Sequence, residues 1–528
     1  MPEISEAGLQ LRKLQSRLKS CAATIDLFDQ DDYDILVIPS LSIDQRQLGK
    51  IPGFLHYEER LLFSLIRLRN PHTRLIYVTA QPLSPAVIDY YLQLLPGIPF
   101  SHARARLLLL STYDSSLKPL SQKILERPRL IGRIRKAMRL DRSYMVCFNS
   151  SLLEQELSLK LGIPLLASCP DLLYWGSKSG SREIFAMAEV AHPDGSLSVE
   201  NEEDLLAKAA ALWQRKPDLK RIVIKLNEGF SGEGNALLDL TPISSHSPRQ
   251  TSLKQAGEAL RDRLPHLRFQ AEDETWEKFS SRLPELGAIV EEYIEGEEKR
   301  SPSFQGYITP SGNVEILSTH DQILGGPDGQ IYLGCRFPAD AVYRLQLQEL
   351  GVKIGKVLAA KGAMERYGVD FVAVRQRDRD PEWQIYAIEI NLRKGGTTHP
   401  FMALKLLTNG EYRTKTGLFH SQDREKYYVA SDNLQKSSYR GLLPGDLMDI
   451  ITRHRLHFDS STKTGTVFHL MGALSEFGKL GLTSIGNSFE EAEAIYNQVE
   501  TVLDTETQTD YSRLLTIPPL PITWYGNN

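Results

Sequence analysis

Short apolar runs alternate with amphipathic stretches through the first third of the chain. The runs occupy residues 34–39, 74–79, 107–110 and 145–148, and polar or turn-forming residues bound each of them. An apolar run of this length is typical of a strand buried on both faces. Because the stretches between the runs carry apolar residues at helical spacing, the pattern predicts an α/β domain with a largely parallel sheet. We expect residues 161–166 to form its last strand.

The clearest pattern lies in the second half of the chain, between residues 369 and 391, and predicts a β-hairpin. Residues 369–376 and 383–391 have the composition of strands, and they flank a charged hexapeptide with one proline. Symmetric pairing places Asp370 opposite Glu389, with Asn391 on the same face. Opposed carboxylates destabilise a strand pair, so a cation is expected between them. Oxygen ligands favour Mg²⁺ or Mn²⁺; a solvated hairpin face is the alternative.

A second pattern predicts a phosphate-binding loop. Residues 221–225 read as a buried strand that ends in Lys225 and runs into a glycine-rich segment, residues 227–235. The backbone N–H groups of such a loop can fold over a polyphosphate, and the lysine can supply charge. No Gly-Lys-Ser/Thr sequence follows the glycines, so this is not a P-loop. Lys178, just before a predicted helix, can also reach a phosphate, although an isolated lysine is more often simply exposed.

An apolar strand that ends in an acidic turn is a candidate nucleoside site. Adenine needs a backbone donor and acceptor at the end of a strand, which residues Glu291, Glu292, Tyr293 and Ile294 can supply. Ribose hydroxyls need a carboxylate, which Glu298 can supply. An acidic surface turn explains the same stretch equally well.

Polar residues further along the chain are candidates for the substrate side of the site. They are His320, Gln322, Arg336, Lys394 and Gly395. Residues 320–327 are expected to form a loop, and Arg336 can pair with a substrate carboxylate. A structural role explains each of these residues equally well.

Charge and composition exclude several classes of protein. With 62 Lys and Arg against 66 Asp and Glu, the net charge of −4 provides no global basic field for nucleic acid or anionic lipid. The basic segment 127–142 has apolar residues at helical spacing and is expected to be a solvated helix face. Four widely spaced cysteines without a CxxC motif are typical of a reducing cytosol. No apolar run approaches the ~18–20 residues that span a bilayer, so we expect a cytoplasmic protein.

Seven short segments, taken in order, resemble the ATP-grasp enzymes that carry a pre-ATP-grasp domain and a C-terminal domain like that of the pheganomycin peptide ligase. The segments are HYEER, GSKSGSREIF, IVIKLNEGFSGEGNA, VEEYIEG, GVDF, EINLRKGGTTHPF and FHLMGALSEFGKLG. The resemblance implies an α/β pre-ATP-grasp domain (residues 1–173) and an ATP-grasp fold of two α+β subdomains that clasp ATP (174–412). A small α/β C-terminal domain (413–528) would follow. The alternative for this last part is an oligomerisation module, which would give a homodimer.

The family resemblance also implies an ADP-forming carboxylate–amine ligase, in which ATP converts a small carboxylate into an acyl phosphate that an amine then attacks. Lys178 and Lys225 would contact the phosphates, and Asp370, Glu389 and Asn391 would bind Mg²⁺. Adenine would be held by the backbone of Glu291 and Ile294, and the ribose by Glu298. The loop over the phosphates would consist of Glu228, Gly229, Phe230, Ser231, Gly232, Gly234 and Asn235.

Arg393 has the E-x-N-x-R spacing of several ATP-grasp ligases, and the resemblance implies that it stabilises the transferring phosphoryl group. D-Ala–D-Ala-type ligases place an arginine two residues before the first metal aspartate, where this chain has Gly368. The oxyanion role must therefore fall to Arg393, Arg336 or Lys394. Two other functions remain open: a nucleotide-binding regulatory protein without ligase turnover, and a small-molecule kinase on the same fold.

Overall fold

The computed structural model describes residues 5–21, 32–43, 48–95, 97–228, 234–249, 251–270, 274–326, 329, 331–376 and 380–508. Within these ranges, no helix is both long and apolar enough to cross a membrane.

Four parallel strands form the first sheet, in the order β3-β2-β1-β4. Each of them is one of the predicted apolar runs, and β1 is buried along its whole length. Residues 161–166 are not a full strand: they add a single parallel bridge, between Leu165 and Met145. The elements are α1 (Glu6–Gln15), η1 (Ser16–Cys21), β1 (Asp34–Ile38), η2 (Phe54–Arg69), β2 (Arg74–Thr79), α3 (Pro85–Gln93), α4 (Phe100–Ala105), β3 (Leu107–Ser111), α5 (Leu120–Leu125), α6 (Pro128–Ala137), η3 (Leu140–Arg142), β4 (Ser143–Cys147), α7 (Leu152–Leu161), η4 (Pro170–Gly176) and α8 (Lys178–Met187).

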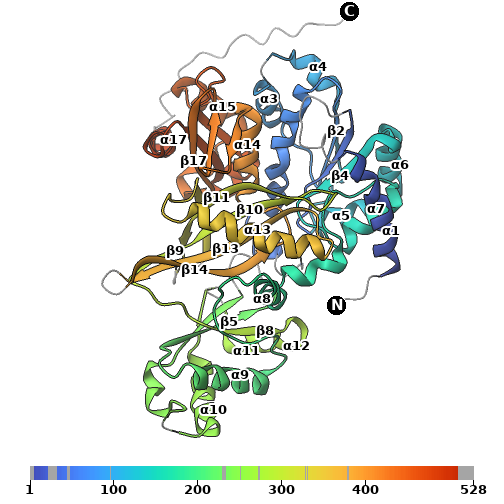
Figure 1. The fold of residues 1–528 in the computed structure, drawn as a ribbon. Coiled ribbons are helices and arrows are strands. Elements are labelled where there is room, and N and C mark those ends of the chain that lie inside the picture. The colour runs from blue at the N-terminus through green and yellow to red at the C-terminus, as the bar shows by residue number, and fades with distance from the viewer. Residues whose placement is uncertain are drawn as a thin grey trace, which may run out of the picture.

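The second sheet is antiparallel, in the order β7-β6-β5-β8, and forms the lower lobe in Figure 1. Its apolar face packs against α9 and α10 in a core of its own that includes Trp213 and Leu260. The elements are α9 (Glu202–Arg215), β5 (Arg221–Leu226), β6 (Asn235–Asp239), η5 (Thr241–His246), α10 (Leu253–Arg261), η6 (Leu264–His266), β7 (Arg268–Phe269), α11 (Trp276–Ser280), α12 (Leu283–Leu286) and β8 (Ala288–Glu292).

The third sheet has 11 strands, and its main path runs β14-β13-β10-β11-β12-β17-β16-β15. It crosses the expected boundary at residue 413, because β12 pairs directly with β17. The C-terminal strands therefore extend the central sheet. The elements are β9 (Glu298–Arg300), β10 (Pro302–Ile308), β11 (Val314–Gly325), β12 (Ile331–Phe337), α13 (Arg344–Ala360), β13 (Glu365–Gln376), β14 (Asp380–Asn391), α14 (Thr398–Thr408), β15 (Glu411–Arg413), β16 (Leu418–Ser421), β17 (Arg424–Gln435), η7 (Ser437–Tyr439), α15 (Pro444–His454), β18 (Gly465–His469), η8 (Met471–Ala473), α16 (Leu474–Phe477), β19 (Lys479–Gly486) and α17 (Phe489–Gln508).

The predicted hairpin of β13 and β14 is present, with a register that changes along its length. Asp370 pairs with Glu389, as symmetric pairing requires. Towards the turn, Gln376 pairs with Asp380 and not with Trp383, because register shifts follow Asp370 and Val374. A bulge adds a residue to one strand and moves the pairing beyond it. The symmetric model is therefore right at the carboxylate end and wrong at the turn.

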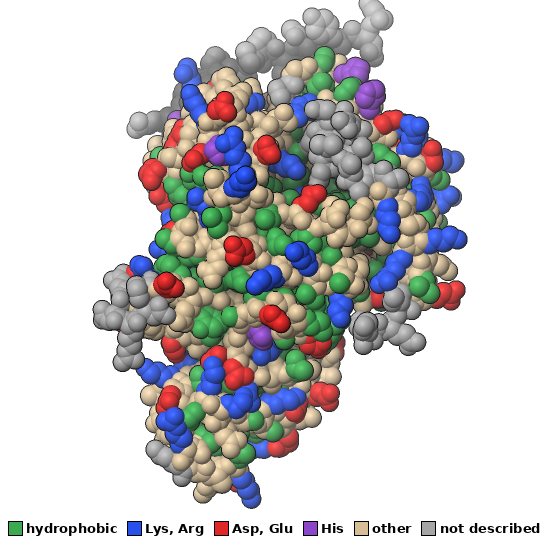
Figure 2. All heavy atoms as spheres, viewed as in Figure 1, with side chains coloured by type: hydrophobic (Ala, Val, Ile, Leu, Met, Phe, Trp, Pro, Cys, Tyr) green, Lys and Arg blue, Asp and Glu red, His purple; other side chains and the backbone are tan. Residues whose placement is uncertain are grey.

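One apolar core joins the N-terminal sheet to the C-terminal strands. It includes Leu61 of η2, Phe401 of α14 and Phe468 of β18, which lie far apart in the sequence. Over the face seen in Figure 2, basic and acidic side chains are interspersed, in keeping with the small net charge. The basic helix α6 buries Leu130 and Ile134, as expected of a solvated face over a core.

Glu58, in η2, is a buried carboxyl between the first sheet and this core. One of its oxygens accepts a 2.6 Å hydrogen bond from the backbone N of Ala80. Burial raises the pKa of Glu58 from 4.5 to about 8, although this hydrogen bond and the charge of Lys123 oppose the shift. The folded state therefore holds this proton more tightly than the unfolded state does.

We predict that this proton makes stability depend on pH. Because the folded pKa is raised, the free energy of unfolding should fall as pH rises from about 5 to about 8, by up to about 1.4 kcal/mol per unit. Glu58→Gln, which cannot ionise, should gain stability relative to the parent over that window in urea titrations. Glu126→Gln, at a carboxylate that pairs with Lys118 on the surface, is the control and should track the parent. If the free energies of unfolding of Glu58→Gln and of the parent changed in parallel with pH, the prediction would be contradicted.

Candidate active site

Residues of the second and third sheets and of η2 line a cavity of about 1320 Å³. Tyr57 and Arg60 of η2 line it from the N-terminal side, and Lys479 of β19 from the C-terminal side. Most of the candidate residues lie on its wall: Lys225, Asn235, Glu291, Glu292, Tyr293, Ile294, Gln322, Arg336, Asp370, Glu389, Asn391, Arg393 and Gly395. Residues from three distant parts of the sequence thus share one concave site, which is typical of a small-molecule site.

The opposed carboxylates form the electrostatic centre of this cavity. Asn391 Nδ2 donates to Asp370 Oδ2 at 3.0 Å, and Gln322 Nε2 donates to Asp370 Oδ1 at 2.5 Å. Lys178, buried as the first residue of α8, places Nζ 3.5 Å from Glu389 Oε1. Burial and the charge of Glu389 raise the pKa of Asp370 to about 7. This donor set, two carboxylates that repel and one amide oxygen, suits a divalent cation with oxygen ligands.

Arg393 follows Glu389 by four residues and lines the same cavity. Burial lowers its pKa, while the charges of Glu389 and Asp370 act in the opposite direction. Its NH1 donates to the backbone oxygen of Lys394 at 3.2 Å. An arginine remains charged in such surroundings, so the cavity holds a fixed cation beside its carboxylates.

Lys225 belongs to a buried cluster that the sequence alone did not reveal. Its Nζ lies 2.7 Å from Glu291 Oε2, and Arg182 NH1 lies 2.6 Å from Glu291 Oε1. Burial opposes ionisation of Glu291, but Lys225 and Arg182 together lower its pKa. The side chain of Glu291 therefore orients Lys225, in addition to any role of its backbone.

Of the other candidates for the nucleoside site, the two glutamates are in ion pairs, while Tyr293 and Ile294 line the cavity. Glu292 turns its carboxylate to Lys216, with Nζ at 2.5 Å, and to the backbone of Asp194. Glu298 pairs with Arg375 at 2.6 Å and is not among the residues that line the cavity. Residues Tyr293 and Ile294 line the cavity directly after β8.

Part of the glycine-rich loop is outside the described residues, namely Gly229, Phe230, Ser231, Gly232 and Glu233. Of its described flanks, Asn235 begins β6 opposite Lys225 and lines the cavity. Gly234 accepts a backbone hydrogen bond from Leu226 at 3.0 Å. Glu228 is the second residue after the end of β5.

Two of the five substrate-side candidates do not face the cavity. His320 is buried in β11, not in a loop, with Nε2 2.6 Å from Tyr428 Oη, and burial lowers its pKa to about 3. Lys394 Nζ pairs with Glu365 at 2.9 Å in the interior. The partner of each side chain comes from another strand, Tyr428 from β17 and Glu365 from β13. Arg336 lines the cavity while it pairs with Glu493 of α17 at 2.7 Å.

Several basic groups of the cavity were missed. Arg60 stacks 4.0 Å over the ring of Tyr57 and places NH2 2.6 Å from Asp432 Oδ2. Lys479 Nζ donates to Tyr57 Oη at 2.7 Å. Arg60 lies in HYEER and Lys479 in FHLMGALSEFGKLG, so two segments of the resemblance contained them. Their contact depends on packing between the two ends of the chain, which no local pattern reveals.

Comparison with known proteins confirms the resemblance. Residues 172–415 match the family model described as IQCH-like, ATP-grasp, and residues 446–499 match the PGM1 C-terminal domain. The chain is 30% identical over 478 residues to the L-propargylglycine–L-glutamate ligase of Streptantibioticus cattleyicolor, covering 89% of this chain and 93% of that protein. It is 22% identical over 525 residues to IQ motif-containing protein H of Danio rerio, covering 92% of this chain and 49% of that one.

Solved structures confirm the predicted fold class. The biotin carboxylase β-γ-ATP complex from Campylobacter jejuni is 13% identical, with a TM-score of 0.50 and coverage of 92% of this chain and 97% of that one. The biotin carboxylase domain of Hydrogenobacter thermophilus 2-oxoglutarate carboxylase, a complex with MgADP, ADP and bicarbonate, is also 13% identical, with a TM-score of 0.52 and coverages of 91% and 95%. With the ligase relative and the family models, these likenesses lead to one conclusion: the chain belongs to the ATP-grasp family, as a carbon–nitrogen ligase with a PGM1-type C-terminal domain.

Proposed function

We propose that this ligase joins the carboxylate of one amino acid to the amine of another, at the expense of ATP. The γ-phosphoryl group passes to a carboxylate oxygen and ADP leaves. The amine then attacks the acyl carbon, phosphate leaves, and the amine loses its proton to the surroundings. The observation that carries the proposal is that Lys225 of the small sheet lines the same cavity as Asp370 of the large sheet and Arg393, which lies just after that sheet's strand β14.

The chemistry of phosphoryl transfer supports this use of the cavity. Such transfer depends on positioning and on neutralising charge that spreads over the phosphoryl oxygens. Lys225 and Lys178 are buried and directed by Glu291 and Glu389, so their ammonium groups have little freedom to reorganise. Arg393 offers a planar fork of donors, suited to phosphoryl or carboxylate oxygens.

A metal ion fits the same site. Asp370 and Glu389 face one another, and burial together with the charge of Glu389 raises the pKa of Asp370. A cation between the two carboxylates would offset their repulsion. These two residues and Asn391 would hold Mg²⁺ or Mn²⁺, which would offset charge on the terminal phosphates of ATP.

The nucleoside would lie along residues 291–294, whose chain follows β8 into the cavity wall. The backbone of Glu291 and Ile294 would hold adenine, and Glu298 would hold the ribose in exchange for part of its contact with Arg375. Residues 228–235 would cover the phosphates, where exclusion of water protects an acyl phosphate.

Amino acid substrates suit the remaining charges. The relative from Streptantibioticus cattleyicolor is named for two amino acids, propargylglycine and glutamate. Arg60 of η2, Arg336 of β12 and Lys479 of β19 all line the cavity. Each can pair with the carboxylate that an amino acid acceptor keeps after the peptide bond forms.

The substrates can be found with ATP and pooled amino acids. Formation of ADP and phosphate, together with a dipeptide in mass spectra of the mixture, is the expected outcome. A phosphorylated product without condensation would identify a kinase. ATP binding without turnover in any pool of amino acids would count against the proposed substrates.

Replacement of Arg393 tests the phosphoryl-transfer step. Arg393→Lys keeps the charge but loses the planar fork of donors, so kcat should fall about 10²- to 10³-fold. The KM for ATP should change little, because the group acts on charge that develops during transfer. Arg249→Lys, a substitution at an exposed ion pair with Asp218, is the control and should leave both constants unchanged. An unchanged kcat in Arg393→Lys would remove Arg393 from the reaction.

Glu291 and Glu292 offer a matched pair of substitutions. Glu291→Gln leaves Lys225 and Arg182 buried without a counter-ion, so the free energy of unfolding should fall by about 3–5 kcal/mol and the KM for ATP should rise. Glu292→Gln removes a carboxylate whose partner Lys216 is 42% exposed, and it should cost about 1 kcal/mol or less. Equal losses in the two variants, measured by urea denaturation, would show that the buried cluster has no special role.

A further inference from the structure

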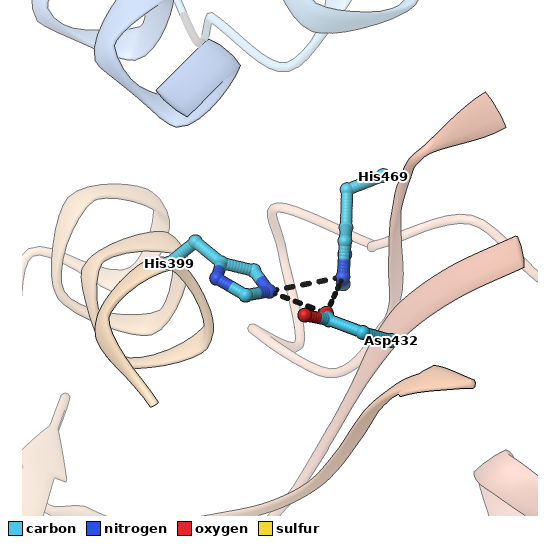
Figure 3. A group of neighbouring side chains, drawn as sticks. All are labelled: His399, Asp432 and His469. Carbon is cyan, nitrogen blue, oxygen red and sulfur yellow. Dashed lines mark hydrogen bonds and ion pairs between the residues drawn. The ribbon is translucent and has the colours of Figure 1, made fainter. Parts of the chain in front are cut away.

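Three buried side chains converge at the wall of the cavity, apart from the carboxylates of β13 and β14. His399 lies in the first turn of α14, Asp432 lies in β17, and His469 is the last residue of β18. Figure 3 shows the Nε2 atoms of both imidazoles directed at one oxygen of Asp432. Each of the three residues is less than 5% exposed. Neither phosphoryl transfer nor the binding of ATP requires this cluster.

The distances within the cluster are hard to reconcile with hydrogen bonds alone. Asp432 Oδ1 lies 2.8 Å from His399 Nε2 and 2.6 Å from His469 Nε2. Because a carboxylate only accepts, both contacts require a hydrogen on each Nε2. The two Nε2 atoms, however, lie 3.0 Å apart, so two N–H groups would then face each other. Removal of either hydrogen leaves a nitrogen lone pair against the carboxylate.

We propose that His399, Asp432 and His469 bind a divalent transition-metal ion of the zinc class. A cation among the three atoms would be approached by three lone pairs, which removes the conflict. Two imidazole nitrogens and one carboxylate oxygen are a common zinc donor set, with bonds of about 2.0–2.2 Å. The neutral imidazole is the form that coordinates a metal. Tetrahedral bonds of that length separate ligand atoms by about 3.3 Å. The three separations of 2.6, 2.8 and 3.0 Å would therefore each have to widen by less than about 1 Å.

The surroundings hold the ligands in place. Arg60 pairs with the second carboxylate oxygen, Asp432 Oδ2, at 2.6 Å, which leaves Oδ1 to the ion. Such partners of ligating carboxylates orient them and tune metal affinity. Gly481 of β19 makes room for the ring of His469, because a Cβ at that position would lie 2.2 Å from its Nε2 and Cδ2 atoms. Any larger residue would displace the imidazole.

The proposed ion would hold together parts of the fold that are far apart in the sequence. It would join α14 to the C-terminal strands β17 and β18, and through Arg60 to η2. Three protein ligands, the number found among the described residues, are typical of zinc sites that keep one position for water or substrate. Asp432 lines the cavity, so the ion would stand in the wall of the substrate side. Binding of this ion does not depend on the proposed ligase reaction.

The first test is the metal content of the intact protein. The protein is purified without chelators, its bound metal is then removed, and it is dialysed against Zn²⁺. Elemental mass spectrometry should then find about one zinc ion per chain. Zinc should raise the midpoint of thermal unfolding, and a chelator should reverse the rise. In the Co²⁺-substituted parent, intense visible absorption should report low-symmetry coordination. A parent protein that takes up no zinc and shows no cobalt absorption overturns the proposal.

Ligand variants make the assignment specific. His469→Ala should lose at least about 100-fold in zinc affinity, since removal of a ligand exceeds the 10- to 100-fold cost of changing an outer partner. His469→Cys should retain the metal and add a thiolate-to-cobalt charge-transfer band, which a purely structural histidine cannot produce. His454→Gln, at a half-exposed histidine paired with Glu506, is the matched control. Asp370→Asn should also keep its zinc, so loss of turnover and loss of this metal are separable.

Two results would contradict the assignment. One is a His469→Ala variant that binds zinc as tightly as the parent. The other is a folded His469→Cys variant whose cobalt spectrum lacks the thiolate band. If His469→Ala does not fold, the cobalt spectra of the parent and of His469→Cys still decide the question.

Discussion

The ladder between β13 and β14 holds two carboxylates, Asp370 and Glu389, directly opposite each other. Such a pair repels, and the folded protein tolerates it because cationic groups surround it. Lys178 reaches Glu389 at 3.5 Å, and Arg393 lines the same cavity. The cavity is therefore prepared for a cation and for anionic phosphates before either arrives. Preorganised charge of this kind is the largest contribution that a protein makes to phosphoryl transfer.

The sequence predicts those features whose partners lie close together along the chain. Asp370, Glu389 and Asn391 belong to one hairpin, so the alternation of side chains along a strand was enough to bring them together. The symmetric pairing fails from Phe371 onward, by one residue at first and by three at Gln376, because an extra residue is invisible in a pattern of alternating side chains.

Contacts between residues far apart in the sequence limit what can be predicted from the sequence alone. Arg182 reaches Glu291 across 109 residues, and Tyr428 covers His320 across 108. Neither pairing follows from local spacing, so the first was missed and His320 was assigned to the substrate side. The resemblance identified the right family and the right segments. It could not say which side chain of HYEER, such as Arg60, would face the cavity.

The C-terminal part explains why substrate specificity is hard to read from the sequence. Because β17 pairs with β12, the C-terminal strands continue the central sheet and bring Asp432 to the cavity wall. Arg60 arrives from the opposite end of the chain and pairs with that aspartate. The substrate side is thus assembled from both ends of the protein, so these side chains come together only when the chain has folded.

Two anionic centres in one cavity raise the question of how metals would be sorted between them. Ligand type gives the answer. The pair Asp370–Glu389 offers oxygen atoms, which suit Mg²⁺, an ion that gives up its water reluctantly. The cluster around Asp432 offers two imidazoles, which bind zinc-class ions far better than Mg²⁺. A magnesium ion would gain little from the histidines. A zinc ion would gain more there than at an all-oxygen site that also has to accept the phosphates of ATP. Softness of the ligands would therefore keep the two ions apart within a single cavity.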